Sequence, residues 1–163
     1  MPHCARENIR CFGRQCLCIK AQHAAFNPEV LGEAEKLVRD SNGIVRLFAS
    51  KVLEVGFSPS LAKSVAIHSG MLLAAESGLL PAIMESDAQS VINLILAGSS
   101  IRSEIGLVID DILDLKSRFD FTCFSFALRS SNRVAHCFAK MALVHALDVV
   151  LFEEAPPSLQ YLV

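Results

Sequence analysis

The chain has 163 residues, of which 52% are hydrophobic, and its formal net charge of -2 gives a pI near 6.2. This length is typical of one domain, and the apolar fraction is enough for a packed core. The charge excludes a nucleic-acid binder that works through bulk positive charge, because such domains usually have a pI above ~9. The absence of Trp and the single Tyr also leave few platforms for stacking bases.

The first 15 residues are expected to form a poorly ordered leader. Residues 1–20 carry four basic side chains and one acid, Glu7, and they lack the apolar run of a secretory signal. The basic start leaves an organelle address open as an alternative to a cytoplasmic or nuclear location. No run reaches the ~18 uninterrupted apolar residues of a membrane helix. We therefore expect an intracellular protein without a membrane partner.

Four of the six cysteines lie in the first 18 residues. Cys4, Cys11, Cys16 and Cys18 are separated by six, four and one residues. Zinc sites usually pair cysteines across two to four residues, twice over. The spacing therefore favours reduced thiols, and a zinc protein built on these cysteines is a minor alternative.

Three extended segments are predicted to open the domain. Residues 16–21 are a short apolar strand, and residues 27–32 contain the Pro and Gly of a turn. Residues 36–39 end a second strand, and the Asn-Gly pair within residues 40–43 is a strong hairpin signal. Residues 44–55 form the returning strand. The charged stretch at 33–36 suits an edge strand that frays.

Strands and helices are then predicted to alternate. The expected elements are a helix from Ser60 to near Gly78, a strand at 82–84, a helix capped by Asp87, a helix capped by Ser103, a Phe-rich strand at 119–128 and a helix from Asn132. A hairpin followed by alternating strands and helices predicts an α/β fold with a mixed sheet. We expect one domain over residues 16–155 and a tail over 156–163.

Five local motifs resemble the ribonuclease H-like domain that plants carry in retroelement-derived genes. They are the hairpin Arg39-Asp40-Ser41-Asn42-Gly43, the helix AKSVAIHSGMLLAAESGL at 62–79, the strand end Glu85-Ser86-Asp87, the helix start at 129–142 and the tail Glu153-Glu154-Ala155-Pro156-Pro157. The likeness covers roughly residues 18–163. It implies a ribonuclease H-like mixed five-stranded sheet flanked by helices.

The resemblance also implies a reaction, cleavage of the RNA strand of an RNA–DNA hybrid by two Mg²⁺ ions. Mg²⁺ prefers oxygen ligands, so the family supplies four carboxylates to hold both ions. These come from the first strand, the start of the first helix, the end of the fourth strand and the start of the last helix.

One of these four acids is retained when the positions are carried over. Asp87 stands at the end of the fourth strand, whereas His23, Lys63 and His136 occupy the first-strand, first-helix and last-helix positions. Asp87 is also placed to cap the next helix. His23 and His136 have alternative interpretations as a plain strand residue and a helix surface residue.

Lys63 is the most damaging of the three substitutions because it brings a positive charge to the proposed metals. A lysine in the first helical turn also opposes the helix dipole, and Ser60-x-x-Lys63 replaces a Ser-x-x-Glu capping box. The sequence therefore predicts a nucleic-acid-binding domain with a degenerate catalytic site and poor Mg²⁺ binding.

Two arginines flank the start of the last helix, Arg129 and Arg133, and are expected to contact phosphates. The expected partner is an RNA–DNA hybrid, and the sequence implies no obligate protein partner. A weakly active hybrid ribonuclease and a noncatalytic interaction scaffold are the alternatives.

Overall fold

The computed structural model describes residues 17–27, 31–40, 42, 44–53, 56–98, 102–128 and 149–152. Within these residues the elements are β1 (Leu17–Asn27), β2 (Leu31–Arg39), β3 (Val45–Leu53), α1 (Pro59–Glu76), β4 (Ala82–Ser86), α2 (Gln89–Ala97), α3 (Glu104–Arg118), β5 (Phe121–Phe126) and β6 (Val149–Phe152). None of the described helices is long and apolar enough to cross a membrane. The bounds 16–155 for the domain stay a prediction.

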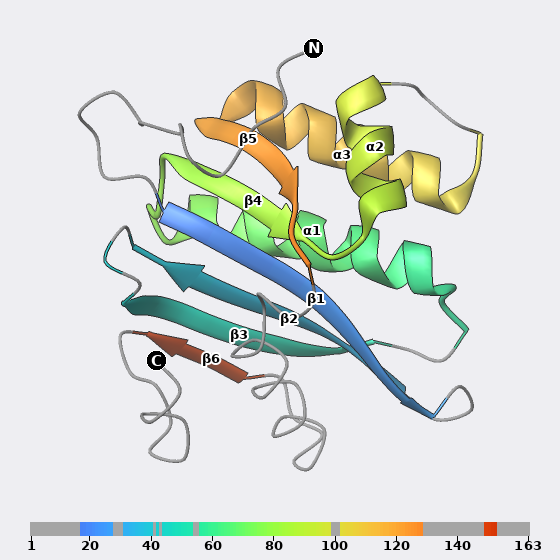
Figure 1. The fold of residues 1–163 in the computed structure, drawn as a ribbon, viewed down its shortest axis with the longest axis horizontal. Helices are drawn as coiled ribbons and strands as arrows, with labels where there is room; N and C mark the ends of the chain where they lie inside the picture. The colour runs from blue at the N-terminus through green and yellow to red at the C-terminus, as the bar shows by residue number, and fades with distance from the viewer. Residues whose placement is uncertain are drawn as a thin grey trace.

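The strands form a mixed sheet in the order β5-β4-β1-β2-β3-β6 (Figure 1). β1, β2 and β3 are antiparallel neighbours, whereas β4 runs parallel to both β1 and β5. The expected ribonuclease H-like mixed sheet is thus confirmed, with β6 as a sixth strand that pairs antiparallel to β3. β6 was not predicted, because four apolar residues carry no periodicity that identifies a strand.

β2 is the one strand whose predicted place is wrong. The charges at 33–36 suggested a frayed edge, but β2 pairs with β1 on one side and β3 on the other along its length. Backbone hydrogen bonds to two neighbours satisfy its peptide groups, and they outweigh the unfavourable side-chain composition.

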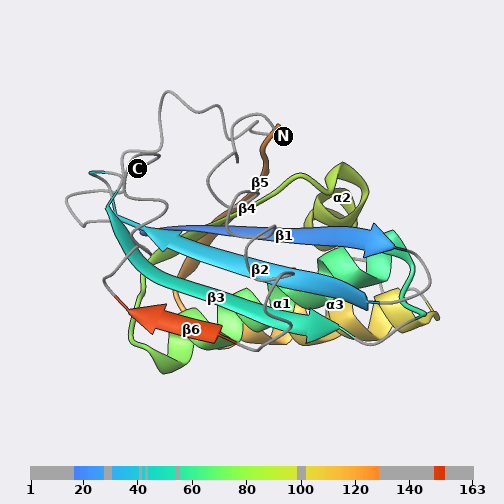
Figure 2. The ribbon, with the colours of Figure 1, turned by 90° about the horizontal axis from the view of Figure 1, so that it is seen from below.

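Helix α1 packs against β1, β2 and β4, and α3 packs on α1 on the same side of the sheet (Figure 2). The buried face of α1 includes Ala62, Ala66, Gly70 and Ala74. A Cβ atom at Gly70 would lie 3.3 Å from the Cγ atom of Lys36 in β2. Small residues therefore let this helix approach the sheet closely, and the approach fixes how the helix is rotated.

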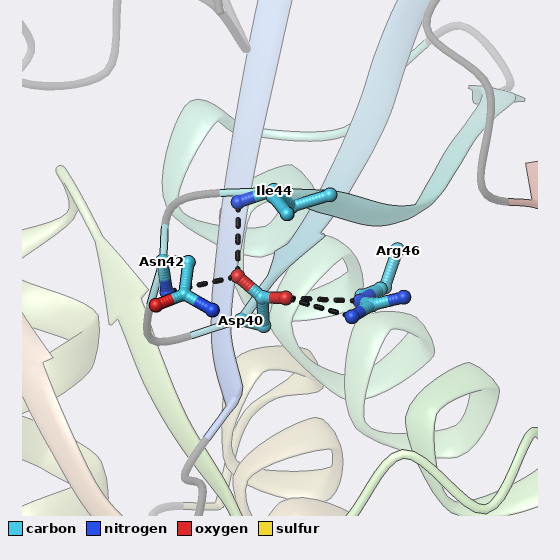
Figure 3. A network of polar contacts seen from close by, with 4 residues as sticks. All are labelled: Asp40, Asn42, Ile44 and Arg46. Atoms are coloured by element: carbon cyan, nitrogen blue, oxygen red, sulfur yellow. Dashed lines mark hydrogen bonds and ion pairs between the residues drawn. The ribbon is translucent and has the colours of Figure 1, made fainter.

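The predicted hairpin between β2 and β3 is confirmed, and Asp40 holds its turn together (Figure 3). Its Oδ1 atom accepts hydrogen bonds from the backbone N–H groups of Asn42 at 2.9 Å and Ile44 at 3.0 Å. Its Oδ2 atom lies 2.9 Å from a terminal guanidinium nitrogen of Arg46. Desolvation alone would raise the pKa of Asp40, but these hydrogen bonds and the Arg46 charge outweigh it and lower the pKa.

Asp40→Asn should lower the melting temperature at neutral pH, since the neutral amide loses the charge interaction with Arg46. A lowered folded-state pKa stabilises the fold above the ordinary Asp pKa near ~3.9, and this contribution disappears as the pH falls through the folded-state value. The difference in melting temperature between wild type and variant should therefore shrink in acid. Asp120→Asn, at an exposed acid, is the control, and a difference that stays constant with pH would contradict the assignment.

Candidate functional site

The candidate site lies where β4 reaches its carboxyl end beside the middle of β1. Asp87 directly follows Ser86, the last residue of β4, and Ser86 pairs with Ala21 of β1. The backbone of His23 lies two residues further along β1, where it pairs with Ala34 of β2. In open α/β sheets, ligands commonly bind beyond the carboxyl ends of the strands. The strand register therefore brings two of the predicted positions to one end of the sheet.

Helix α1 supplies the third position to the same place. The Nζ atom of Lys63 lies 3.5 Å from the Oδ1 atom of Asp87. The Lys63 side chain is 26% exposed and the Asp87 side chain 10% exposed. This Oδ1 atom makes no hydrogen bond within the described part of the chain, so the Lys63 ammonium compensates its charge. The sequence placed both residues in the site but gave no sign that they form an ion pair.

Two local expectations about these residues are wrong. Asp87 does not cap α2, because Ala88 is the N-cap residue and makes no side-chain capping bond. Ser58, not Ser60, caps α1 by accepting a 3.2 Å hydrogen bond from the Leu61 N–H. Lys63 therefore lies beyond the first turn, where the unfavourable effect of the helix dipole has weakened. The cap expected at Ser103 of α3 is confirmed by its bond from the Gly106 N–H.

The acid nearest in sequence to Asp87 does not join it. Burial alternates along β4, so that Met84 and Ser86 are buried and Glu85 between them is not. The Oε2 atom of Glu85 lies 3.5 Å from the Nζ atom of Lys20, its register partner in β1. Burial is the largest cause that raises the pKa of the adjacent Cys18 thiol to about 12, and the charge of Glu85 is the second. Glu85 is therefore engaged on the other face of the sheet. The sequence does not predict this cluster, because only the strand register brings its residues together.

Metal ligation is poorly supported by the described residues. Among them, no group of three or more His, Cys, Asp or Glu side chains could hold an ion. Asp87 would be a ligand in the family's arrangement, but an ammonium already lies 3.5 Å from its carboxylate. A second cation would meet like charge at this position. This part of the site does not fit a pair of Mg²⁺ ions.

The remaining predicted residues are not tested by the structure. Arg129, Arg133 and His136 lie outside the described residues, as do Cys4, Cys11 and Cys16. The side chain of His23 is not described either. Their roles stay predictions.

The strand order, with α1 and α3 packed on one side of the sheet, defines a ribonuclease H-like α/β domain. Residues 23–142 match the family described as reverse transcriptase-like, and the chain belongs to that family. No curated protein matches the sequence. The expected plant lineage stays a prediction.

Several solved structures share this fold. Ribonuclease H1 from the halophilic archaeon Halobacterium salinarum NRC-1 has a TM-score of 0.70 at 15% identity, over 79% of this chain and 98% of that one. The N-terminal ribonuclease H domain of Rv2228c from Mycobacterium tuberculosis has a TM-score of 0.68 at 14% identity, over 82% and 96%. LC11-RNase H1, solved in complex with an RNA/DNA hybrid, has a TM-score of 0.68 at 12% identity, over 80% and 98%. Identities this low show the fold alone.

Removing Lys63 should destabilise the protein more than removing the charge of Asp87. Lys63→Met leaves a nearly buried carboxylate without its counter-charge, which costs about 1–3 kcal/mol of unfolding free energy. Asp87→Asn leaves a lysine whose side chain is a quarter exposed and can turn to water, so the loss should stay below ~1 kcal/mol. Urea unfolding of both variants and of the double variant measures the interaction free energy between Lys63 and Asp87. Equal losses would contradict this account of the pair.

Cys18 should react slowly with iodoacetamide in the folded protein. The thiolate is the reactive form, and a pKa of about 12 leaves almost none of it at neutral pH. Peptide mass spectrometry should find Cys18 labelled only after denaturant is added or the pH is raised toward its pKa. Rapid labelling of native protein at neutral pH would contradict the assigned burial and the Glu85 contact.

Proposed function

We propose that this domain binds RNA–DNA hybrids and that its hybrid-cleaving site is degenerate. The observation that carries the proposal is the ion pair between Lys63 and Asp87. Support for the ligand comes from the family and from the fold shared with LC11-RNase H1, whose structure contains an RNA/DNA hybrid. The assignment of an RNA–DNA hybrid to this chain rests on that likeness.

Cleavage by the family's reaction would need Mg²⁺, which activates water and stabilises the leaving oxygen when bound. Asp87 is the residue that would hold it. His23 and His136 offer imidazole nitrogens where the family has carboxylate oxygens, and Mg²⁺ is a hard ion that binds nitrogen poorly. Because Lys63 adds positive charge as well, we infer that Mg²⁺ binds weakly and that hybrid cleavage is slow or absent.

The alternative of a weakly active nuclease requires nearby acids to replace the missing ligands. Glu85 is the candidate closest in sequence, and its pairing with Lys20 on the other face of the sheet disfavours that role. Noncatalytic binding is therefore the better supported function.

Binding has to depend on local charge, because the net charge of the chain is -2. We assign phosphate contacts to Arg129 and Arg133, which flank the start of the predicted last helix. Such contacts hold a duplex in register without reading its sequence. The proposal also includes one domain over 16–155, within which the family match at 23–142 falls, and a cytoplasmic or nuclear location.

A fluorescence binding and cleavage assay on an RNA–DNA hybrid tests the proposal. We expect binding that weakens with salt, and no cleavage with Mg²⁺ or Mn²⁺. In the double variant Arg129→Gln/Arg133→Gln, the slope of the logarithm of the binding constant against the logarithm of the salt concentration (the salt slope) should be smaller by about 2, one for each phosphate contact. Arg118→Gln is the control for the loss of one positive charge away from the site, because Arg118 lies two residues before Asp120, whose carbonyl accepts a hydrogen bond from Ala82 at the opposite end of β4 from Asp87.

Two other outcomes would each replace the proposal. Hybrid cleavage that Asp87→Asn abolishes would establish a weakly active ribonuclease. Absence of both binding and cleavage in wild type would leave the interaction scaffold.

A further inference from the structure

We propose that the Lys63 ammonium replaces the divalent cation of this site, both as the counter-charge of Asp87 and as an anchor for a phosphate of the bound nucleic acid. The phosphate role rests on the proposed function, whereas the counter-charge role does not. The consequence is a site whose stability and nucleic-acid binding are independent of divalent metal.

The charges of the pair support the first role. Asp87 is 10% exposed, and a carboxylate so far removed from water needs a compensating charge. The Nζ atom of Lys63 provides it at 3.5 Å. One ammonium balances one carboxylate, so the retained acid has no remaining charge that a divalent ion would be needed to neutralise.

The exposure of the pair supports the second role. Lys63 is the more accessible partner, at 26% against 10%, so solvent and ligands reach the ammonium more readily than the carboxylate. An ammonium has three N–H donors, more than a single carboxylate oxygen at this distance takes up. Lysine binds phosphate as a point charge, without the fixed geometry that arginine requires.

The helix around Lys63 fixes the origin of its side chain. Ala62 and Ser64 on either side are fully buried. The Ser64 hydroxyl donates a 2.7 Å hydrogen bond to the Leu61 carbonyl, within the same turn. Asp87 is held on the other side by its place after β4. Both partners therefore start from ordered elements, and the ammonium is positioned before any ligand arrives.

Thermal unfolding with EDTA, Mg²⁺ or Mn²⁺ tests the first role without nucleic acid. The wild-type melting temperature should be the same in all three solutions. In EDTA, Lys63→Glu should have a lower melting temperature than wild type, because the introduced carboxylate would repel Asp87. Its melting temperature should then rise with the concentration of added Mg²⁺ or Mn²⁺. Lys63→Gln is the control and should respond less than Lys63→Glu, because it leaves one carboxylate at the site instead of two. A wild type stabilised by Mg²⁺, or a folded Lys63→Glu protein that ignores both cations, would overturn the counter-charge role.

Hybrid binding at matched ionic strength tests the second role and does not need the Lys63→Glu protein. Wild type should bind equally well in EDTA and in Mg²⁺. Lys63→Gln should bind about fivefold more weakly, the change that one exposed charge contact produces, and its salt slope should fall by about 1. Arg118→Gln should bind like wild type in Mg²⁺ and in EDTA.

The outcomes separate this inference from the proposed function. Wild-type binding that requires Mg²⁺, or Lys63→Gln binding as tightly as wild type, would overturn the phosphate role while hybrid binding itself stands. A wild type that binds no hybrid would overturn the proposed function and the phosphate role together, and the unfolding experiment would then decide the counter-charge role alone.

Discussion

The close contact between α1 and the sheet determines where Lys63 lies relative to Asp87. Gly70 brings the helix so near to β2 that a Cβ atom there would lie 3.3 Å from the Lys36 Cγ atom. At this separation the helix cannot rotate without steric overlap, so the face that carries Ala62 must point inward. The next residue, Lys63, then emerges at the rim of the helix beside the carboxyl end of β4. The electrostatics of the site therefore follow from a packing constraint along the length of the helix.

Each member of the Lys63–Asp87 pair accounts for the presence of the other. A carboxylate that is 10% exposed would be costly without a partner, and a lysine that is 26% exposed gains a partner for its charge. Together they form a neutral unit that stabilises the end of β4. The ion pair therefore gives Asp87 a structural role that does not depend on catalysis.

Local signals predicted the fold well, while contacts between distant segments could not be predicted. The Asn-Gly pair marked the hairpin that Asp40 stabilises, and Ser103 marked the start of α3, because both signals act over a few residues. The central place of β2 depends on partners on both sides, which its charged composition conceals. The site was predicted as a set of positions, but the ion pair between Lys63 and Asp87 depends on how α1 packs against β4. The periodicity of a single sequence cannot predict how close these two side chains lie.

The end of β4 carries two acids whose charges are compensated by lysines of other elements. Two acids, Glu85 and Asp87, stand one residue apart, and each lies 3.5 Å from a lysine, Lys20 for the first and Lys63 for the second. Without those lysines the strand end would repel phosphate, as unoccupied carboxylates do. In a metal-dependent site, bound cations remove that repulsion and are lost when a chelator is added. Here the compensating charges belong to β1 and α1, so they stay in place as long as the fold does. A domain with a net charge of -2 can thus be locally neutral at this end of β4, although the charge of the whole molecule is negative.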